Sequence, residues 1–365
     1  MHLLWMGFYQ ALTMFWDTLW ALVLGFAISA ALQVLVSRDQ MNRMFGQTNL
    51  KTMLLATGFG AASSSCSYAA VAAGRSAFQK GAALTVVLAF MFASTNLVIE
   101  LGAIIWVLIG WQFVLAEVVG AFVLIAVMWL LVRRIFPRNL EEEARAHSRE
   151  VGEIIRSHGC DEEADSGSMS TVSGKLARLA NAFVMDWRMI WKELVIGFLV
   201  AGFLAALVPP SWWRAIFIQE GPAWLRLIEN AAVGPIIGIA SWVCSCANIP
   251  LASLLWTNGI SFGGVISFIY ADLIVVPIIF IYRKYFGGRA ALYITSIFYV
   301  SMVAAGIIVD LIFSGLGLVP HGARRPGAMA HAAFHWNYTT WLDLAGIAIA
   351  LWFLFLTLRA RRRAI

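Results

Sequence analysis

Two short stretches of this apolar chain place thiols among hydroxyls. The first, "GAASSSCSYAA" (60–70), contains Cys66, and the second, "GIASWVCSCAN" (238–248), contains Cys244 and Cys246. Thiols bind soft partners and exchange them reversibly, so both stretches are candidate ligand sites. The pair at 244 and 246 is spaced too tightly for a redox Cys-x-x-Cys motif and supplies too few ligands for a structural zinc site. We therefore expect no bound metal or cofactor, and a small-molecule ligand instead.

The two stretches belong to an internal repeat. Shifting the chain by 178 residues aligns them without a gap, and further matches continue as far as Val98 and Val276. In the two stretches, Gly60, Ala62, Ser63, Cys66, Ser67 and Ala69 fall on Gly238, Ala240, Ser241, Cys244, Ser245 and Ala247. A shared order of elements over such a length indicates duplication, so the candidate ligands come in two matched sets.

The composition indicates an integral membrane protein. The 365-residue chain is 61% hydrophobic and 13% charged, with 16 Trp and 24 Phe, and its mean hydropathy is +0.80. Soluble domains are about half apolar and about a quarter charged. In a membrane protein a net charge of +6 belongs to loops beside the bilayer, so we expect a lipid partner and no nucleic-acid partner.

Apolar length divides the chain into spans, since a helix needs about 20 residues to cross the bilayer. The predicted spans are 12–36, 82–108, 112–132, 190–208, 261–282, 290–314 and 340–358. The Cys-containing stretches, 52–79 and 229–257, carry Gly, Ser and Asn near their middle, and we expect re-entrant hairpins there. The hydrophilic residues 137–186 are predicted to form a flexible cytoplasmic loop.

The basic residues favour hairpins over complete spans. With hairpins, each half has an odd number of crossings, so the two halves are inverted. Nearly all basic loop residues then lie inside, as the positive-inside tendency requires. The expected fold is an all-α membrane protein of two inverted repeats, residues 1–136 and 187–365, each with three transmembrane helices and a Ser/Cys hairpin, plus an extra C-terminal helix. We expect the protein to lie in the bacterial inner membrane with its C-terminus in the cytoplasm. The sequence does not decide whether it forms a homodimer.

The hairpin tips are predicted to meet near mid-membrane. Hydroxyls such as Ser65, Ser67 and Ser245 suit a turn because they cap the half-helix that follows. The N-terminus of that half-helix presents free N–H groups and a positive dipole end. The tips would therefore form a polar, partly electropositive site lined by the thiols. Close packing of small residues between helices is the structural alternative.

One carboxylate lies about halfway along a predicted span. Asp272 follows "SFIY" in 261–282, and a carboxylate at that depth costs at least about 2.5 kcal/mol and usually marks function. Its repeat counterpart is Ser94, and Asn96 lies close by with Glu100 one turn further on. We interpret Asp272 and Glu100 as candidate proton-coupling groups, with a hydrogen-bonded structural Asp272 as the alternative. Five other acidic residues are expected to be interfacial: Asp17, Glu117, Glu193, Asp310 and Asp343.

These motifs resemble a known family. With "CSYAAVAAGRSAFQKGAAL", "FASTNL" and "CSCANIPLASLLWTNG" in view, the chain is similar to the bacterial predicted permeases that include organoarsenical efflux permeases, the ArsP/YraQ-like group. The resemblance covers most of the chain outside 137–186. Departures are Tyr68 in place of a second Cys, Ala69 and Ala72 in place of Gly and Pro, and Asp272 in place of a small polar residue. The resemblance implies efflux of trivalent organoarsenicals for some members.

The sequence therefore predicts a secondary transporter and not an enzyme. Cys66, Cys244 and Cys246 would bind a thiophilic solute, Ser65, Ser67, Ser245 and Asn96 would orient it, and Asp272 with Glu100 would couple it to protons. A small anion such as a sulfur oxyanion is the alternative substrate, because helix N-termini favour anions. A channel and a membrane thiol oxidoreductase are the alternatives from other classes. The sequence contains no ATP-binding loop of the G-x-x-x-x-G-K-[ST] kind, so we do not expect this chain alone to be an ATP-driven pump.

Overall fold

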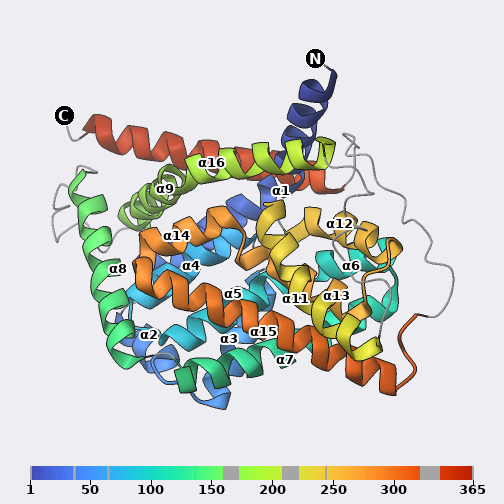
Figure 1. Cartoon of the computed structure of the whole chain (residues 1–365). Helices are drawn as coiled ribbons and strands as arrows, with labels where there is room; N and C mark the ends of the chain where they lie inside the picture. Colours follow the sequence, from blue (N-terminus) through green and yellow to red (C-terminus); the bar gives the residue numbers. More distant parts are fainter. Residues whose placement is uncertain are drawn as a thin grey trace.

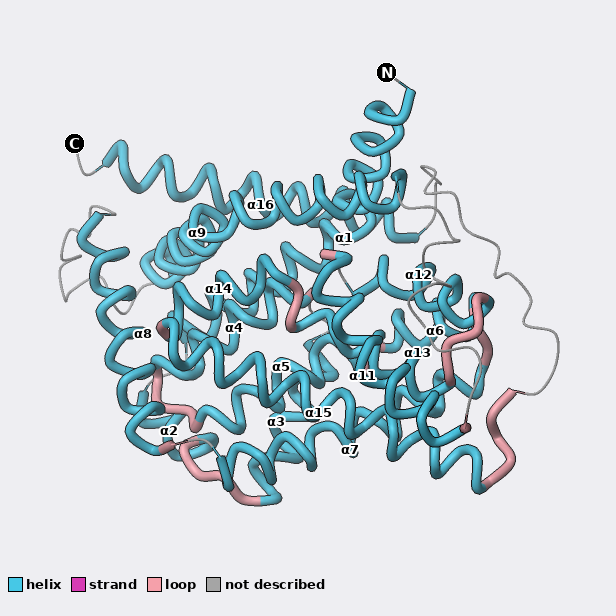
Figure 2. Tube along the Cα trace, in the orientation of Figure 1, coloured by secondary structure: helices cyan, strands magenta, loops and turns pink. Residues whose placement is uncertain are grey.

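The computed structural model describes residues 2–35, 38–63, 66–135, 137–158, 172–207, 222–242, 245–320 and 338–363. Within these ranges the chain is helical and contains no strand (Figures 1 and 2). The helices are α1 (His2–Leu35), α2 (Arg38–Phe45), α3 (Leu50–Ser63), α4 (Ser67–Gln79), α5 (Leu84–Asn96), α6 (Ile99–Leu108), α7 (Trp111–Ile135), α8 (Arg138–His158), α9 (Val172–Leu207), α11 (Ala223–Ser241), α12 (Ser245–Thr257), α13 (Phe262–Ile269), the 3₁₀ turn η2 (Tyr270–Leu273), α14 (Val276–Phe286), α15 (Gly288–Gly315) and α16 (Tyr338–Arg363). The expected all-α class is confirmed for the described residues.

Several helices are long and apolar enough to cross a membrane. Among the described residues there are four, Trp111–Ile135, Ala223–Ser241, Gly288–Gly315 and Thr340–Arg359, or five if a bent pair counts as one span. Helices α7, α15 and α16 agree with the predicted spans 112–132, 290–314 and 340–358. Helices α1 and α9 include residues 12–35 and 190–207 of the spans predicted for 12–36 and 190–208 but begin earlier, and they are 34 and 36 residues long. The protein is therefore a multi-pass membrane protein.

Helix boundaries repeat along the chain with the same shift as the sequence. Helices α3 and α11 end at Ser63 and Ser241, and α4 and α12 begin at Ser67 and Ser245, which are 178 residues apart. The elements that follow also correspond in order and position, α5 with α13, α6 with α14, and α7 with α15. Described residues mark an interruption in both Cys-containing stretches, since Cys66 has extended backbone angles and Trp242 has left-handed ones.

Two predicted spans differ from expectation, because each is a pair of helices. The stretch 82–108 breaks between α5 and α6, where Val98 has extended backbone angles. The stretch 261–282 breaks after η2, and its two arms, Phe262–Leu273 and Val276–Phe286, meet at 44°. Pro277 in the first turn of α14 contributes to this break, since proline supplies no backbone N–H to the preceding turn. The polar triplet "STN" and Asp272 thus lie at matched helix breaks.

The bundle has two ends, which side-chain contacts identify. At one end, the α8 end, the C-terminus of α4 meets that of α14, where the Phe78 and Phe286 rings lie 5.4 Å apart. At the other end, the aromatic end, the ring of Phe113 lies 5.1 Å from that of Trp256 and 4.6 Å from that of Phe262. Phe262 also contacts Phe313, near the C-terminus of α15. Helices α5 and α15 therefore begin at the α8 end, whereas α7 and α13 begin at the aromatic end.

Helix α8 corrects the prediction that 137–186 is a flexible loop. Residues 138–158 form a helix that runs across the ends of α14 and α15 (Figure 1), and α9 already begins at Val172. The buried side chains Leu140, Ala144 and Ser148 recur every four residues and so form one packed face. Residues 159–171, with the predicted solvated Cys160, lie outside the described residues.

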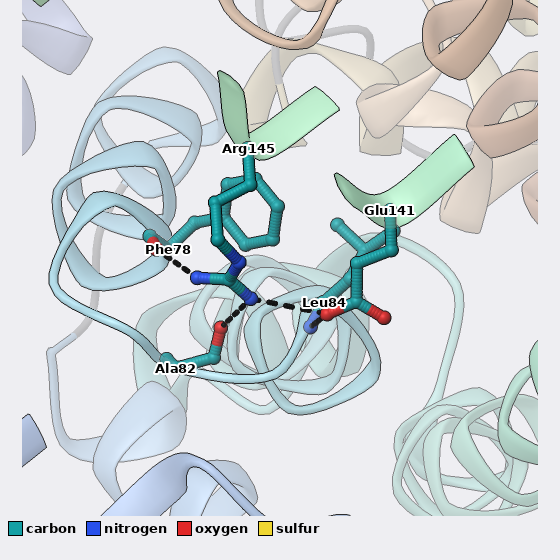
Figure 3. A network of polar contacts seen from close by, with 5 residues as sticks. All are labelled: Phe78, Ala82, Leu84, Glu141 and Arg145. Atoms are coloured by element: carbon teal, nitrogen blue, oxygen red, sulfur yellow. Dashed lines mark hydrogen bonds and ion pairs between the residues drawn. The ribbon is translucent and has the colours of Figure 1, made fainter. Parts of the chain in front are cut away.

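An arginine fixes α8 to the turn between α4 and α5 (Figure 3). The Arg145 guanidinium donates to the carbonyl oxygens of Phe78 at 2.6 Å and Ala82 at 3.0 Å. Its neighbour Glu141 accepts from the Leu84 backbone N–H at 3.3 Å. A cation at the carboxyl end of one helix and an anion at the amino end of the next both stabilise the helix dipoles. This end of the bundle is therefore held by charge-assisted hydrogen bonds.

Matched glycines let helices α3 and α11 pack closely against α5 and η2, the helix-break elements of their own halves. A Cβ atom on Gly238 would lie 2.3 Å from the Ala271 Cβ, and one on Gly60 would lie 2.8 Å from the Ala93 Cβ. Because real carbon atoms do not approach so closely, both positions require glycine. Ala93 and Ala271 are themselves repeat counterparts, so the same packing is built twice.

We predict that Gly238→Ala destabilises the protein, because the added methyl must displace the backbone of η2. Overpacking of this kind costs about 1–3 kcal/mol. The matched control is Gly58→Ala in α3, where a Cβ would meet nothing within 4 Å, and helix propensity predicts a neutral or stabilising effect. Thermal unfolding of purified protein in detergent measures both. Equal melting temperatures for the two variants would contradict this packing.

Candidate functional site

The centre of the candidate site is the carboxylate of Asp272. Asp272 lies in η2, the 3₁₀ turn at the break between α13 and α14, and its side chain is 1% exposed. The turn itself is stabilised by hydrogen bonds that satisfy its backbone: the Ile274 N–H donates to Ala271 at 3.1 Å, and the Tyr282 hydroxyl donates to the Leu273 carbonyl at 3.0 Å. A local break thus presents a carboxylate to the middle of the bundle.

Two serines from the two halves of the chain bind this carboxylate. Ser67 Oγ donates to Asp272 Oδ2 at 2.8 Å, and Ser245 Oγ donates to the same oxygen at 2.6 Å. The two hydroxyl oxygens lie 3.1 Å apart. Because Ser67 and Ser245 are repeat counterparts, the tips of both interrupted stretches meet on one side chain. Hydrogen bonds to an ionised group contribute about 1.5–3 kcal/mol each, which offsets part of the desolvation of a buried charge.

Helix termini favour negative charge at this point. Ser67 and Ser245 are the first residues of α4 and α12, each 13 residues long. The first turn of a helix has free N–H groups and a partial positive charge. The Asp272 carboxylate, bound to Ser67 and Ser245, therefore lies beside the amino ends of both helices. The repeat counterpart Ser94 has its hydroxyl bonded to Met91 of its own helix at 3.0 Å, so of the two matched helix breaks the one in the second half carries the carboxylate.

One oxygen of the Asp272 carboxylate, Oδ1, can still accept a hydrogen bond. Oδ1 is buried, and no hydrogen-bond partner for it occurs among the described residues. The matched polar triplet lies near, since α5 packs against η2. Within the triplet, the Asn96 amide donates to the Phe92 carbonyl and to Thr95 Oγ1, both at 3.1 Å. Asn96 thus closes the end of α5 and is not seen to bind Asp272 itself.

The remaining predicted site residues divide into placed and undescribed ones. Cys66 is the N-cap residue of α4 and is buried beside Ser67, with extended backbone angles. Cys244 and Ser65 lie outside the described residues, and so do the side chains of Cys246 and Glu100. The structure therefore brings together Ser67, Ser245 and Asp272, with Cys66 adjacent to them in the chain.

Two acidic residues predicted to be interfacial are instead buried. Glu117 is 2% exposed in α7, and Asp343 is fully buried in α16. Asp343 Oδ1 accepts from the Trp20 backbone N–H at 3.0 Å and so links α16 to α1. The prediction was wrong because it used the distance of each residue from the end of its span. In the structure, neighbouring helices cover both residues. Asp310 is partly exposed and accepts from the Gly263 N–H at 2.7 Å near the aromatic end.

Comparison with known proteins identifies the family. The model of the ArsP_1 family, described as "Predicted permease", matches residues 6–311. The chain belongs to the ArsP predicted-permease family. It is also 44% identical over 321 residues to "Putative permease Rv2963" of Mycobacterium tuberculosis, covering 86% of this chain and 78% of that protein. No solved structure matches the chain.

Family membership gives the apolar bundle a role. A permease moves a solute across a membrane, which implies a transporter rather than an enzyme. The family match spans every element from α1 to most of α15, including both interrupted stretches and both helix breaks. The Ser67–Asp272–Ser245 cluster therefore lies within the part of the permease that the family shares.

We predict that Ser67→Ala and Ser245→Ala each lower the free energy of unfolding by about 1.5–3 kcal/mol, because each removes a hydrogen bond from a buried charge. Since both serines bind one oxygen, the double variant should depart from additivity. Thermal or denaturant unfolding in detergent measures the cycle. The matched control is Ser314→Ala, which removes an exposed Ser–Asp hydrogen bond and should change stability by less than about 0.5 kcal/mol. If the two serine variants lowered the free energy of unfolding as little as Ser314→Ala does, and their effects added in the double variant, the two serines would not share one carboxylate.

Proposed function

We propose that this permease is a secondary transporter of the bacterial inner membrane, in which a small solute and a proton are exchanged at Asp272. The observation that carries the proposal is that Ser67 and Ser245, one from each half, bind a single buried carboxylate. A transporter that works by alternating access needs a site where two mobile halves meet. A proton-coupled one also needs a group that is stable both charged and neutral. Asp272 meets both requirements.

The directions of the matched elements support alternating access between inverted repeats. Helices α5 and α13 correspond in sequence but begin at opposite ends of the bundle, and α7 and α15 do so as well. Inverted repeats with broken helices at a central site are a recurring transporter architecture. Basic residues gather at the α8 end: Arg133, Arg134, Arg283, Lys284 and Arg289. By the positive-inside tendency, we assign the α8 end and the C-terminus to the cytoplasm.

Cys66 favours a thiophilic substrate, such as a trivalent organoarsenical. Its thiol is buried at the start of α4, one residue from the hydroxyl that binds Asp272. A soft arsenic(III) centre exchanges between thiols, which makes binding tight and still reversible. In this proposal Cys244 and Cys246 supply further thiols from the second half, and transport is directed outward. Binding at the tips would displace the serine hydroxyls from Asp272.

A small anion, such as a sulfur oxyanion, is the second candidate substrate. The observation in its favour is that α4 and α12 both begin at the site, and helix N-termini bind anions. The ionised carboxylate of Asp272 already occupies that position. An anion could therefore bind only when Asp272 is protonated, which would make the solute and the proton travel together. The two substrates thus predict opposite relations between proton and solute movement.

We predict that Asp272→Asn reduces uptake driven by a pH gradient to the level of vesicles without the permease, because a neutral amide cannot exchange a proton. The measurement is accumulation of a methylated trivalent arsenical, or of thiosulfate, in everted membrane vesicles with an imposed pH gradient. Asp310→Asn is the matched control, since Asp310 lies away from the tips and binds the Gly263 backbone. Full gradient-driven uptake by Asp272→Asn would refute proton coupling at this residue.

A second variant in the same assay separates the substrates. Cys66→Ser should abolish transport of the arsenical, because a hydroxyl does not replace a soft ligand. If thiosulfate is the substrate, Cys66→Ser should retain transport. If Cys66→Ser takes up the arsenical at the rate of the natural chain, the hypothesis of a thiophilic substrate is contradicted. The small anion then remains as the proposed substrate.

A further inference from the structure

Glu117 is a second buried carboxyl group close to Asp272. It lies in α7, 2% exposed, and neither of its carboxyl oxygens has a hydrogen-bond partner among the described residues. Its electrostatic neighbours are Asp272 and Tyr270 of η2. A polar group that is buried without a partner is costly, and an ionised one much more so. Packing alone therefore does not explain why a carboxyl group is buried at position 117.

The turn that holds Asp272 is fixed to the helix that holds Glu117. The Tyr270 hydroxyl donates to the backbone carbonyl of Glu117 at 2.9 Å. Gly120 makes room for this contact, since a Cβ there would lie 2.2 Å from the tyrosine oxygen. The hydrogen bond joins α7 of the first half to η2 of the second half. Movement of Asp272 relative to Glu117 is therefore restrained by a contact between the halves.

The other titratable groups around Glu117 have their own partners or are remote. Helices α5 and α13 carry no titratable side chain. On α15, Asp310 is bonded to Gly263 and Tyr299 is bonded to the Ala232 carbonyl. Helix α6 carries Glu100, whose side chain is not described. No cationic side chain occurs on the α7 segment from Trp111 to Trp129 or on η2. Among the described side chains, Asp272 is the acidic neighbour with which Glu117 can share a proton.

The two carboxyls have opposite environments. Asp272 receives two hydroxyl donors and the N-termini of two helices, which stabilise its ionised form. Glu117 receives no donor among the described residues, which stabilises its neutral form. Two titratable groups in contrasting environments divide the acid and base roles between them.

We propose that Glu117 and Asp272 share one proton, which lies on Glu117 in this conformation. The inference rests on the proposed role of Asp272 and adds the group that supplies its proton. When a solute takes the Ser67 and Ser245 hydroxyls, Asp272 loses the two donors nearest to it, and its ionised form becomes less stable. The two carboxyls are not hydrogen-bonded to each other, so the step needs a water molecule between them. The O–H bond of Glu117 breaks and its proton passes to this water, which gives one of its own protons to Asp272 Oδ1. The net charge of the pair does not change.

The position of Glu117 sets the side from which the proton returns. Glu117 follows Phe113 by about one helical turn, and Phe113 belongs to the aromatic end. Glu117 therefore lies between Asp272 and the aromatic end, which we assign to the outside. After it has given up its proton, Glu117 takes another from that side, so protons enter as the solute leaves.

Infrared spectroscopy of the purified permease in lipid tests the location of the proton directly. A protonated carboxyl has a carbonyl stretch that an ionised carboxylate lacks, and this band shifts on exchange into D₂O. We expect the natural chain to keep such a band at mildly alkaline pH. Glu117→Gln should lose it, whereas Asp272→Asn and the exposed control Glu142→Gln should retain it. Glu117→Asp should retain a band at a shifted frequency, which separates loss of the proton from loss of the fold.

Two results would overturn the inference. One is a band that survives in Glu117→Gln and disappears in Asp272→Asn, which places the proton on Asp272. The other is the absence of a band in the natural chain. Neither readout requires a transported substrate, so the spectroscopic result stands if the proposed function fails.

The vesicle assay adds a functional arm, with the methylated trivalent arsenical as the probe. Glu117→Gln should retain solute exchange between equal concentrations and lose accumulation driven by the pH gradient. Gradient-driven uptake equal to that of the natural chain would show that Glu117 does not carry the coupled proton. If the natural chain itself shows no gradient-driven uptake, the proposed function fails and the infrared arm alone decides the location of the proton.

Discussion

The constraint on which this structure depends is the burial of one carboxylate where the two halves of the chain meet. A charge at that depth is unstable unless donors surround it. Asp272 obtains its donors from Ser67 and Ser245, which lie at the same position of the two repeats. The tips of both interrupted stretches must therefore reach the same point, and the span that carries Asp272 must break there. The helix breaks and the close glycine contacts follow from this requirement.

The repeat in the sequence accounts for the two similar halves of the structure. The difference between the halves, a carboxylate at one of the two matched helix breaks, gives the site its titratable group. Matched helices, matched breaks and matched Gly–Ala contacts give two similar halves. Only the second half carries a carboxylate at the break, because Ser94 stands at the equivalent position and binds its own helix. A site with two carboxylates would place like charges together at high cost. One carboxylate between two serines keeps the pairing of the halves and leaves a single carboxylate between the two tips.

Sequence reasoning named Ser67, Ser245 and Asp272 as candidates because their signals were local and strong. Serines and glycines within apolar stretches indicated the tips, and a carboxylate in a span indicated function. The break between α5 and α6 was missed because Leu97 and Val98 carry no turn signal. At the end of α5 the Asn96 amide instead binds the Phe92 carbonyl of its own helix.

The remaining misses have similar physical causes. Helix α8 was taken for a loop because it is hydrophilic, although Leu140, Ala144 and Ser148 recur at helical spacing. That spacing was available in the sequence. Glu117 could not have been found in this way, since its burial depends on α15, α5 and α6 packing against α7. Distance from a span end does not measure burial within a bundle.

The central claim is that the tips of the two interrupted stretches meet, and a cross-link tests it most directly. The Ser67 and Ser245 hydroxyl oxygens are 3.1 Å apart, close enough for Ser67→Cys and Ser245→Cys to form a disulfide. The variant would be built without other cysteines and with a protease site inserted between α8 and α9. After oxidation in membranes and cleavage, the account predicts that the two fragments migrate together on a non-reducing gel and separate on reduction. Fragments that separate without a reducing agent, as a Ser67→Cys and Ser314→Cys control should, would contradict it.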